Sequence, residues 1–219
     1  MSDVLSELRE AILRGEYAPR QRLIETELAE RFSTSRFVLR NAFTKLATEG
    51  LVELQPNRGA RVREVSLDEA IEITELRRAI EGLIAGRAAE RVTDAEIKAL
   101  RAIGEEMQAA VGRADMLRYS DLNAQLHFRV RAIARHTSAS RIIEQLHGQM
   151  VRHQFRLSLM PGRPFTSLPE HLAIIDAIAA RDPAAAEEAM RVHLTSVLTA
   201  LSNFSPFGSP SSPGSSLPR

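Results

Sequence analysis

The strongest constraint on the fold is a series of helix-start motifs in the second part of the chain. Capping-box patterns occur at Ser66-x-x-Glu69, Thr93-x-x-Glu96 and Ser167-x-x-Glu170, and each can satisfy the exposed amides of a helix start. Asp182-Pro183 adds a fourth start, because an N-cap residue precedes a proline at the first helical position. The predicted helices are 67–91, 94–112, 114–135, 139–160, 168–181 and 183–203. Such a series is typical of an antiparallel helical bundle.

Residues 1–65 have a different pattern. Apolar residues at helical spacing predict three short helices, of which the third runs from about Ser35 to Gly50. The segments 51–54 and 60–63 flank a turn-rich stretch and predict a β-hairpin. Three helices followed by a hairpin form a winged helix-turn-helix.

We therefore expect a mainly α protein with three parts. Residues 1–65 form an N-terminal winged helix-turn-helix, and residues 66–204 form a C-terminal all-helical antiparallel bundle. Residues 205–219 are rich in Ser, Pro and Gly and bury too little apolar surface to offset the entropy of ordering. They are expected to be a disordered tail.

Composition excludes several classes of protein. No stretch reaches the roughly 18 consecutive apolar residues that a membrane-spanning helix needs. The N-terminus has no basic segment followed by an apolar core, as a secretory signal would. Cysteine is absent, which excludes disulfide scaffolds and thiolate metal sites. These features predict a cytoplasmic protein without a membrane partner.

Basic residues are concentrated in the predicted winged helix, although the whole chain has a net charge of only +1. Between Arg36 and Arg63 there are six basic and two acidic residues. Arg36 and Arg40 are four residues apart near the start of the third helix, and arginine pairs bidentately with guanine. This pattern predicts contacts with base edges of double-stranded DNA. The alternative is a solvated basic face on a small helical domain.

Further residues of this segment are expected to contact the DNA backbone. Hydroxyl and amide groups at the start of a helix can bind phosphate. A basic residue at the hairpin tip can enter the minor groove or hold a phosphate. The expected DNA-binding residues are Ser33, Thr34, Ser35, Arg36, Arg40, Lys45 and Arg58.

The histidines of the bundle predict a metal site. His171 and His193 are each eleven residues from Asp182, so they lie at the same height of an antiparallel helix hairpin. Asn123 and His127 are at positions i and i+4 of one helix. Three imidazoles and one oxygen suit a divalent first-row metal, with zinc or nickel favoured over calcium or magnesium. The alternative is that these histidines are separate, partly buried side chains with backbone partners.

Three further histidines, His136, His147 and His153, have no such spacing. We expect them to be structural or surface residues.

The winged-helix segment also matches a known sequence pattern. The matching positions are Leu8, Ile12, Gly15, Pro19, Leu23, Ile24, Glu25, Leu28, Ser35, Arg36, Arg40, Leu46, Gly50, Leu51, Asn57, Arg58 and Gly59. This run, over about residues 4–65, resembles the GntR family of bacterial transcription regulators. The sequence departs from the family pattern at Arg20, at Phe37-Val38-Leu39 and at Asn41. The last two departures lie beside the base-reading arginines and bear on the operator sequence.

Residues 67–203 resemble the FCD-type effector domain that follows many GntR winged helices. The matching motifs are Glu75-Leu76-Arg77 with Glu81, Asn123 with His127, and Glu170-His171 with Asp182 and His193. The resemblance implies a metal held at the centre of the bundle by four residues, typically one Asp and three His. Asn123 stands at the position of the Asp, and its amide oxygen is a neutral, weaker ligand.

The resemblance also implies an effector, because effectors of this family are often small organic acids. A carboxylate can bridge the metal and a nearby arginine, and Arg77 is the expected effector-binding residue. The alternative is that Arg77 and Glu81 form only an intrahelical pair, worth a few tenths of a kcal/mol.

The expected function is therefore a DNA-binding transcriptional regulator, a repressor that acts as a homodimer on operator DNA. Its helical domain is expected to bind the metal and a small carboxylate effector that modulates operator binding. Two alternatives are a metal-dependent hydrolase with a DNA-binding appendage and a metal-storing or purely dimerising module. An enzyme is not expected, because no HExxH segment, Ser-centred elbow or acid–base pair stands out. Glu170 adjoins His171 but points about 100° away from it on a helix.

Overall fold

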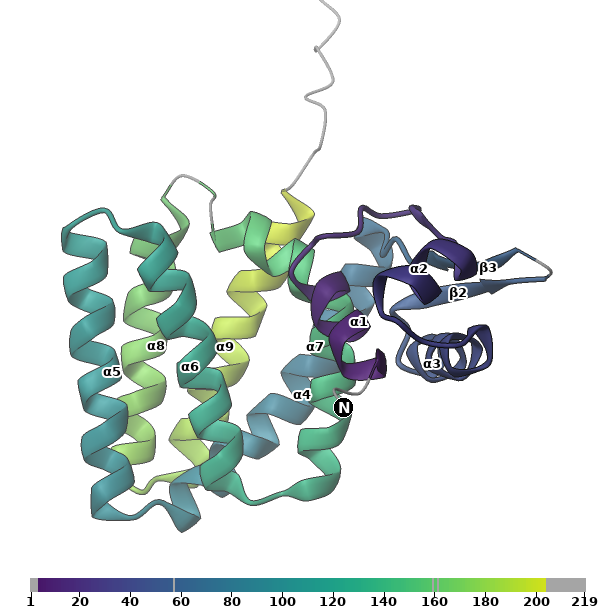
Figure 1. Ribbon diagram of the computed structural model, residues 1–219. Coiled ribbons are helices and arrows are strands. Elements are labelled where there is room, and N and C mark those ends of the chain that lie inside the picture. The colour runs from purple at the N-terminus through teal and green to yellow at the C-terminus, as the bar shows by residue number, and fades with distance from the viewer. Residues whose placement is uncertain (1–3, 57, 159, 161, 204–219) are drawn as a thin grey trace, which may run out of the picture.

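The computed structural model describes residues 4–56, 58–158, 160 and 162–203. A small N-terminal part with a three-stranded sheet lies beside a larger bundle of helices (Figure 1). The expected disordered tail, residues 205–219, lies outside the described residues. Within the described part of the chain, no helix is both long and apolar enough to cross a membrane.

The N-terminal part has the predicted winged helix-turn-helix order. Its elements are α1 (Val4–Leu13), β1 (Arg22–Leu23), α2 (Glu25–Arg31), α3 (Arg36–Thr48), β2 (Val52–Gln55) and β3 (Gly59–Val62). The hairpin is confirmed, but the sequence analysis missed β1, which is only two residues long. β1 pairs antiparallel with β3, so the strand order is β1-β3-β2.

Gly59 makes this third strand possible. Its φ is +81°, which glycine adopts without strain, and a Cβ there would lie 2.7 Å from the backbone oxygen of Leu23. Above the sheet, Leu8 of α1 and Leu39, Phe43 and Leu46 of α3 are buried in a separate hydrophobic core. This core fixes the outward face of α3.

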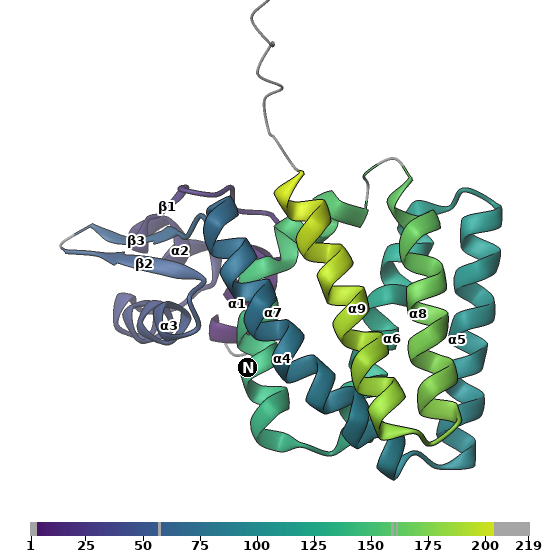
Figure 2. The same cartoon turned by 180° about the vertical axis from the view of Figure 1, so that it is seen from behind.

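The bundle consists of six helices in the described residues after Val65. They are α4 (Leu67–Arg91), α5 (Asp94–Gly112), α6 (Met116–Ala134), α7 (Thr137–Ser158), α8 (Arg163–Ala179) and α9 (Pro183–Ser202). The predicted N-caps Ser66, Thr93 and Asp182 are confirmed, because each side chain accepts a hydrogen bond from a backbone N–H of the first turn. The predicted antiparallel bundle is therefore confirmed (Figure 2).

The predicted start of α8 at Ser167 is wrong. Pro164 lies in the first turn of this helix, which begins at Arg163, about one turn earlier than expected. Ser167 is buried inside the helix, and its hydroxyl donates to the backbone oxygen of Arg163. A proline in the first turn costs no helical hydrogen bond, so it competes well with a capping box as a start signal.

α4 and α9 pack closely along their lengths (Figure 2). A Cβ at Gly82 would lie 3.2 Å from Cγ of Arg191, and one at Gly86 would lie 3.2 Å from the oxygen of Pro183. Because these two positions have no side chain, the axis of α9 can lie close to the axis of α4.

α7 connects the bundle to the winged helix. Gln145 Nε2 donates to the oxygen of Thr48 (3.0 Å) and Gln149 Nε2 to the oxygen of Glu49 (3.2 Å), so both satisfy carbonyls at the end of α3. His153 Nε2 lies 2.9 Å from the oxygen of Val65, consistent with the structural role expected for it.

The buried core of the bundle makes a stability prediction. Leu100 of α5 is fully buried, and we expect Leu100→Ala to lower the free energy of unfolding by about 2–5 kcal/mol because it removes packed atoms and leaves a cavity. The matched control is Leu117→Ala on α6, where the side chain is 63% exposed and the expected change is within about 0.5 kcal/mol. Urea unfolding measures both, and equal changes would contradict the assigned core.

Candidate metal centre and DNA-binding face

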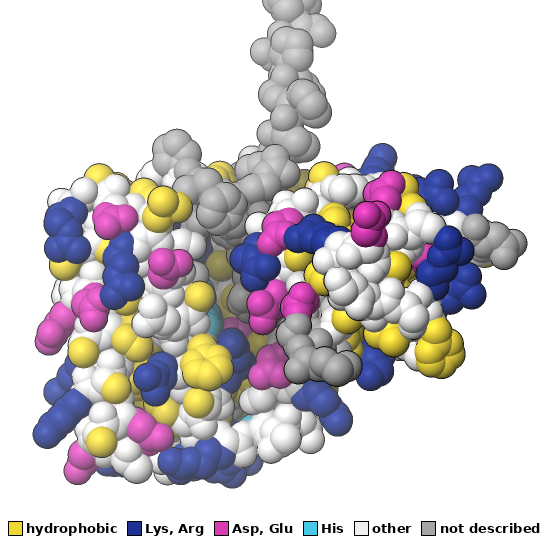
Figure 3. Space-filling model, viewed as in Figure 1, with side chains coloured by type: hydrophobic (Ala, Val, Ile, Leu, Met, Phe, Trp, Pro, Cys, Tyr) yellow, Lys and Arg dark blue, Asp and Glu magenta, His cyan; other side chains and the backbone are white. Residues whose placement is uncertain are grey.

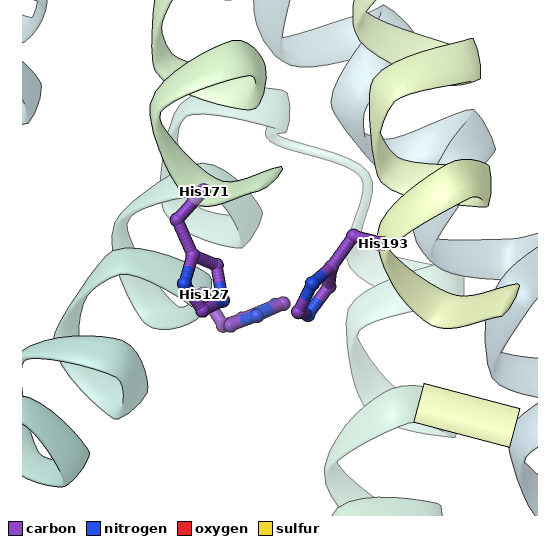
Figure 4. Close-up of side chains that lie close together, drawn as sticks. All are labelled: His127, His171 and His193. Atoms are coloured by element: carbon purple, nitrogen blue, oxygen red, sulfur yellow. The ribbon is translucent and has the colours of Figure 1, made fainter. Parts of the chain in front are cut away.

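Three histidines from three helices meet at the centre of the bundle. His127 comes from α6, His171 from α8 and His193 from α9, and all three are buried. Each offers a ring nitrogen, and these nitrogens lie within 4.8 Å of one another. The rings face a common centre (Figure 4), and the centroids of His171 and His193 are 4.4 Å apart. The alternative of separate histidines with backbone partners does not describe this arrangement.

Carboxylates outside the cluster orient two of the rings. His127 Nδ1 lies 3.0 Å from Glu81 Oε2 of α4, and His193 Nδ1 lies 2.8 Å from Glu170 Oε2 of α8. An ionised carboxylate only accepts hydrogen bonds, so Nδ1 carries the proton wherever its partner is ionised. Arg77 and His127 hold the pKa of Glu81 low, whereas burial raises the pKa of Glu170. With the proton on Nδ1, the Nε2 lone pair of each ring faces inward. Such carboxylate–histidine pairs also orient metal-binding histidines in proteins.

A chain of hydroxyl groups orients the third ring. His171 Nδ1 lies 3.0 Å from the Tyr119 hydroxyl, which lies 2.7 Å from Ser167 Oγ. Ser167 donates its own proton to the oxygen of Arg163. Tyr119 therefore donates to Ser167 and accepts from His171 Nδ1, so the Nε2 lone pair of His171 also faces the cluster.

Two buried acceptors on α6 and α8 have no hydrogen-bond partner among the described residues. They are His171 Nε2 and the side-chain oxygen Oδ1 of Asn123, which lies one turn before His127 on α6. Burying an acceptor without a hydrogen bond costs free energy. Converging imidazole lone pairs and an amide oxygen therefore fit a divalent cation with nitrogen and oxygen ligands.

Burial favours the neutral forms of His171 and His193. Burial lowers the pKa of His171 and His193 well below the usual histidine value, and the neighbouring rings add to this effect. Burial would raise the pKa of Glu81, but Arg77 and His127 outweigh it and hold this carboxyl in its ionised form. Burial raises the pKa of Tyr119 to about 12, so the phenol keeps its proton.

Arg77 lies beside this network. Its Nε donates to Glu81 Oε1 at 2.7 Å, and both side chains are buried. The pair is intrahelical, as one of the alternatives held, but it also fixes the carboxylate that orients His127.

The sequence analysis missed Tyr119, Ser167 and Glu170 as parts of the site. The direction of Glu170 relative to its neighbour His171 excludes a contact between these two, but Glu170 contacts His193 of the next helix. The side chain of His147 lies outside the described residues.

The expected DNA-binding cations are all exposed, but Lys45 lies about half a turn around α3 from Arg36. Arg36, Arg40 and Lys45 are exposed on α3, and Arg58 is exposed at the hairpin. Figure 3 shows Lys and Arg side chains gathered on this part of the surface. Arg22, which the sequence analysis did not select, lines a groove with Arg36, Arg40 and Arg58 between α3 and the hairpin. Arg40 also forms an ion pair with Glu25 (3.0 Å).

The three hydroxyl residues before α3 have different environments. Ser33 is exposed with a φ of +48°, and Thr34 is half-buried. Ser35 is the N-cap, because its hydroxyl accepts from the backbone N–H of Val38 at 3.3 Å. Its side chain is thus already engaged, whereas the free amides of the helix start remain suited to phosphate.

Two protein-family models match the chain. The model "Bacterial regulatory proteins, gntR family" matches residues 1–62, and the FCD domain model matches residues 72–196. FCD domains are known to bind metal ions, and GntR regulators bind operator DNA and small-molecule effectors.

Characterised relatives cover most of the chain. The HTH-type transcriptional repressor RspR of Escherichia coli (strain K12) is 32% identical over 190 residues, which is 87% of this chain and 83% of the relative. A probable D-xylose utilization operon transcriptional repressor of Paenarthrobacter nicotinovorans is 28% identical over 178 residues, with 80% and 77% of the two chains covered.

A solved structure shows the same fold. E. coli McbR/YncC superposes with a TM-score of 0.74 at 21% identity, and the match covers 91% of this chain and 95% of that chain. The family models and the relatives also decide between the functional alternatives, in favour of a regulator and against a hydrolase. This chain belongs to the GntR family of bacterial transcription regulators, with an FCD domain behind its winged helix, and is a DNA-binding transcriptional regulator rather than an enzyme.

Proposed function

We propose that this protein is a homodimeric repressor whose operator binding is modulated by a small carboxylate effector bound at a metal centre. The observation that carries the proposal is the cluster of three oriented imidazoles, with the unpartnered oxygen of Asn123 one turn before His127 on α6, behind a GntR winged helix. Because operator DNA is its target, we place its action in the cytoplasm. The division of the chain at residue 65 is also part of this proposal.

The proposed metal ligands are Asn123, His127, His171 and His193. The donor set suits zinc or nickel, since neutral imidazoles bind first-row transition metals well, whereas calcium and magnesium prefer sites made mostly of oxygen ligands. When bound, such a metal supplies a positively charged centre for the oxygens of a small acid. The residues of the chain hold and orient it, with Glu81, Tyr119 and Glu170 fixing the rings.

Arg77 is the proposed second contact of the effector. Its bond with Glu81 uses Nε, and a guanidinium carries further N–H groups on its two Nη atoms. A carboxylate that reaches these groups also competes for the arginine that holds Glu81. Effector binding at Arg77 therefore acts on the carboxylate that orients His127.

Two arguments support a homodimer. One winged helix makes a limited set of phosphate contacts, and two copies on a pseudo-palindromic operator double both the contacts and the sequence that is read. In addition, Leu76 and Leu83 lie seven residues apart on α4 and are 56% and 39% exposed. They share one face of the helix, which suits an apolar contact with a second copy.

The first test concerns the recognition helix. We expect Arg36→Ala and Arg40→Ala each to cost about 1–3 kcal/mol of operator binding and to relax specificity, because each removes a base contact. Titration of an operator selected from random duplexes measures this effect. Arg101→Ala, on the exposed side of α5, is the matched control. Unchanged affinity in both α3 variants would exclude α3 as the reading helix.

The second test concerns the metal. Protein purified without chelator should contain close to one divalent ion per chain by elemental analysis, lost on chelation and in His171→Ala or His193→Ala. His136→Ala should keep the ion, because His136 lies outside the cluster and bonds the backbone N–H of Ala139. The metal-free protein should bind operator but no longer respond to candidate organic acids. A metal-free wild type, together with a normal response of His171→Ala, would refute the metal's role.

The third test concerns the neutral ligand. Asn123→Asp should tighten metal binding, since a charged oxygen replaces a neutral one, and Asn123→Ala should weaken it. Competition with a chelator of known affinity gives both dissociation constants. If neither substitution changes the constant, Asn123 is not a ligand.

A further inference from the structure

An aromatic side chain stands out on the surface of α3. Phe37, in the first turn of this helix, is 73% exposed, the highest value of any large hydrophobic side chain in the described residues. Its neighbour Val38 is 41% exposed. Neither residue contributes to the core of the winged helix. Packing within the chain therefore gives no reason for an aromatic ring here.

The ring lies on the outermost line of α3. The buried side of the helix is formed by Leu39, Ala42, Phe43 and Leu46. At about 100° per residue, Phe37 and Asn41 fall on the opposite side, with Thr44 one turn further on. If α3 lies in a groove with its buried side facing its own domain, Phe37 and Asn41 are the residues that point into that groove.

The surroundings of Phe37 favour a polyanion over an apolar protein surface. Arg36 and Arg40 are exposed beside it on α3, and Arg22 and Arg58 line the adjacent groove. In the space-filling view, hydrophobic side chains over α3 lie next to Lys and Arg side chains (Figure 3). An apolar partner would have to strip water from these guanidinium groups, whereas the DNA backbone pairs with them.

In a helix-turn-helix, the first turns of the recognition helix reach base edges in the major groove. There, thymine presents a C5-methyl group, which apolar side chains such as phenylalanine contact, and adenine presents N6 and N7, which asparagine binds with its amide. Guanine and unmodified cytosine have no such methyl group. We propose that Phe37 and Asn41 make the operator half-site specific for A·T base pairs, with Phe37 on a thymine methyl and Asn41 on an adenine edge.

This inference rests on the proposed role of α3 but goes beyond it. Arg36 and Arg40 suit guanine, so the half-site should combine G·C pairs read by arginine with A·T pairs read by Phe37 and Asn41. Phe37 and Asn41 are thus specificity-determining residues, separate from the cations that supply most of the salt-dependent affinity.

The test uses the full-length protein and an operator selected from random duplexes. Each thymine of the half-site is replaced in turn by deoxyuridine, which removes the C5-methyl group alone. We expect one or two symmetry-related replacements to weaken wild-type binding about fivefold. The Phe37→Ala variant should bind the thymine operator more weakly by a similar factor. Its affinity should not change further when the same thymine is replaced by deoxyuridine. Asn41→Ala should lose its preference for adenine in a second selection.

Two controls make the result interpretable. Leu117→Ala removes another strongly exposed hydrophobic side chain, from α6, and should leave both operator binding and the effect of uracil unchanged. Arg36→Ala reports on the recognition helix itself. If Arg36→Ala weakens binding but uracil and Phe37→Ala have no effect, the inference is overturned and the role of α3 stands. If Arg36→Ala, Arg40→Ala and Phe37→Ala all leave binding unchanged, α3 does not read DNA and both proposals fall.

Discussion

The close packing of three buried imidazole rings at the centre of the bundle is the constraint on which the candidate metal centre depends. A proton on one ring would place a cation in a buried site, and burial already holds the pKa of His171 and His193 low. Glu81, Tyr119 and Glu170 each accept from an Nδ1 proton, so the protons lie outside the cluster and the Nε2 lone pairs lie inside. Lone pairs that face one another repel, and a bound cation removes that repulsion. The helices around the cluster are thus arranged to present acceptors to one point.

α4 joins this cluster to the DNA-binding part of the chain. In its middle, Glu81 holds His127, and at its start Glu69 forms an ion pair with Arg63, which follows β3. α7 holds the far end of α3 through Gln145 and Gln149. Among the described residues, these polar contacts join the winged helix to the bundle, and its buried apolar core is separate from that of the bundle. Hydrogen bonds of this kind can exchange partners at lower cost than packed core side chains can.

The outer face of α3 is under different constraints from its inner face. Leu39, Phe43 and Leu46 are buried in the core of the winged helix, so packing constrains their size and spacing. Phe37 and Asn41 are exposed and belong to neither the core nor its partly buried neighbours. Departures from the family pattern on this face therefore bear on what the helix reads, while the folding of the domain is unaffected.

Sequence alone determined the order of the helices and of the β-hairpin and predicted the three histidines that cluster, because caps and apolar spacing act over a few residues and an antiparallel hairpin equates positions equidistant from its turn. His171 and His193 were found by that symmetry about Asp182. Prediction from sequence failed for residues whose role depends on a contact with another helix. Glu170 orients His193, and Ser167 is a buried hydrogen-bond partner of Tyr119 instead of a helix cap. Neither role can be recognised from the residues that are adjacent in sequence. Only tertiary packing, including the close approach of α4 and α9 at their glycines, decides which side chains of separate helices meet.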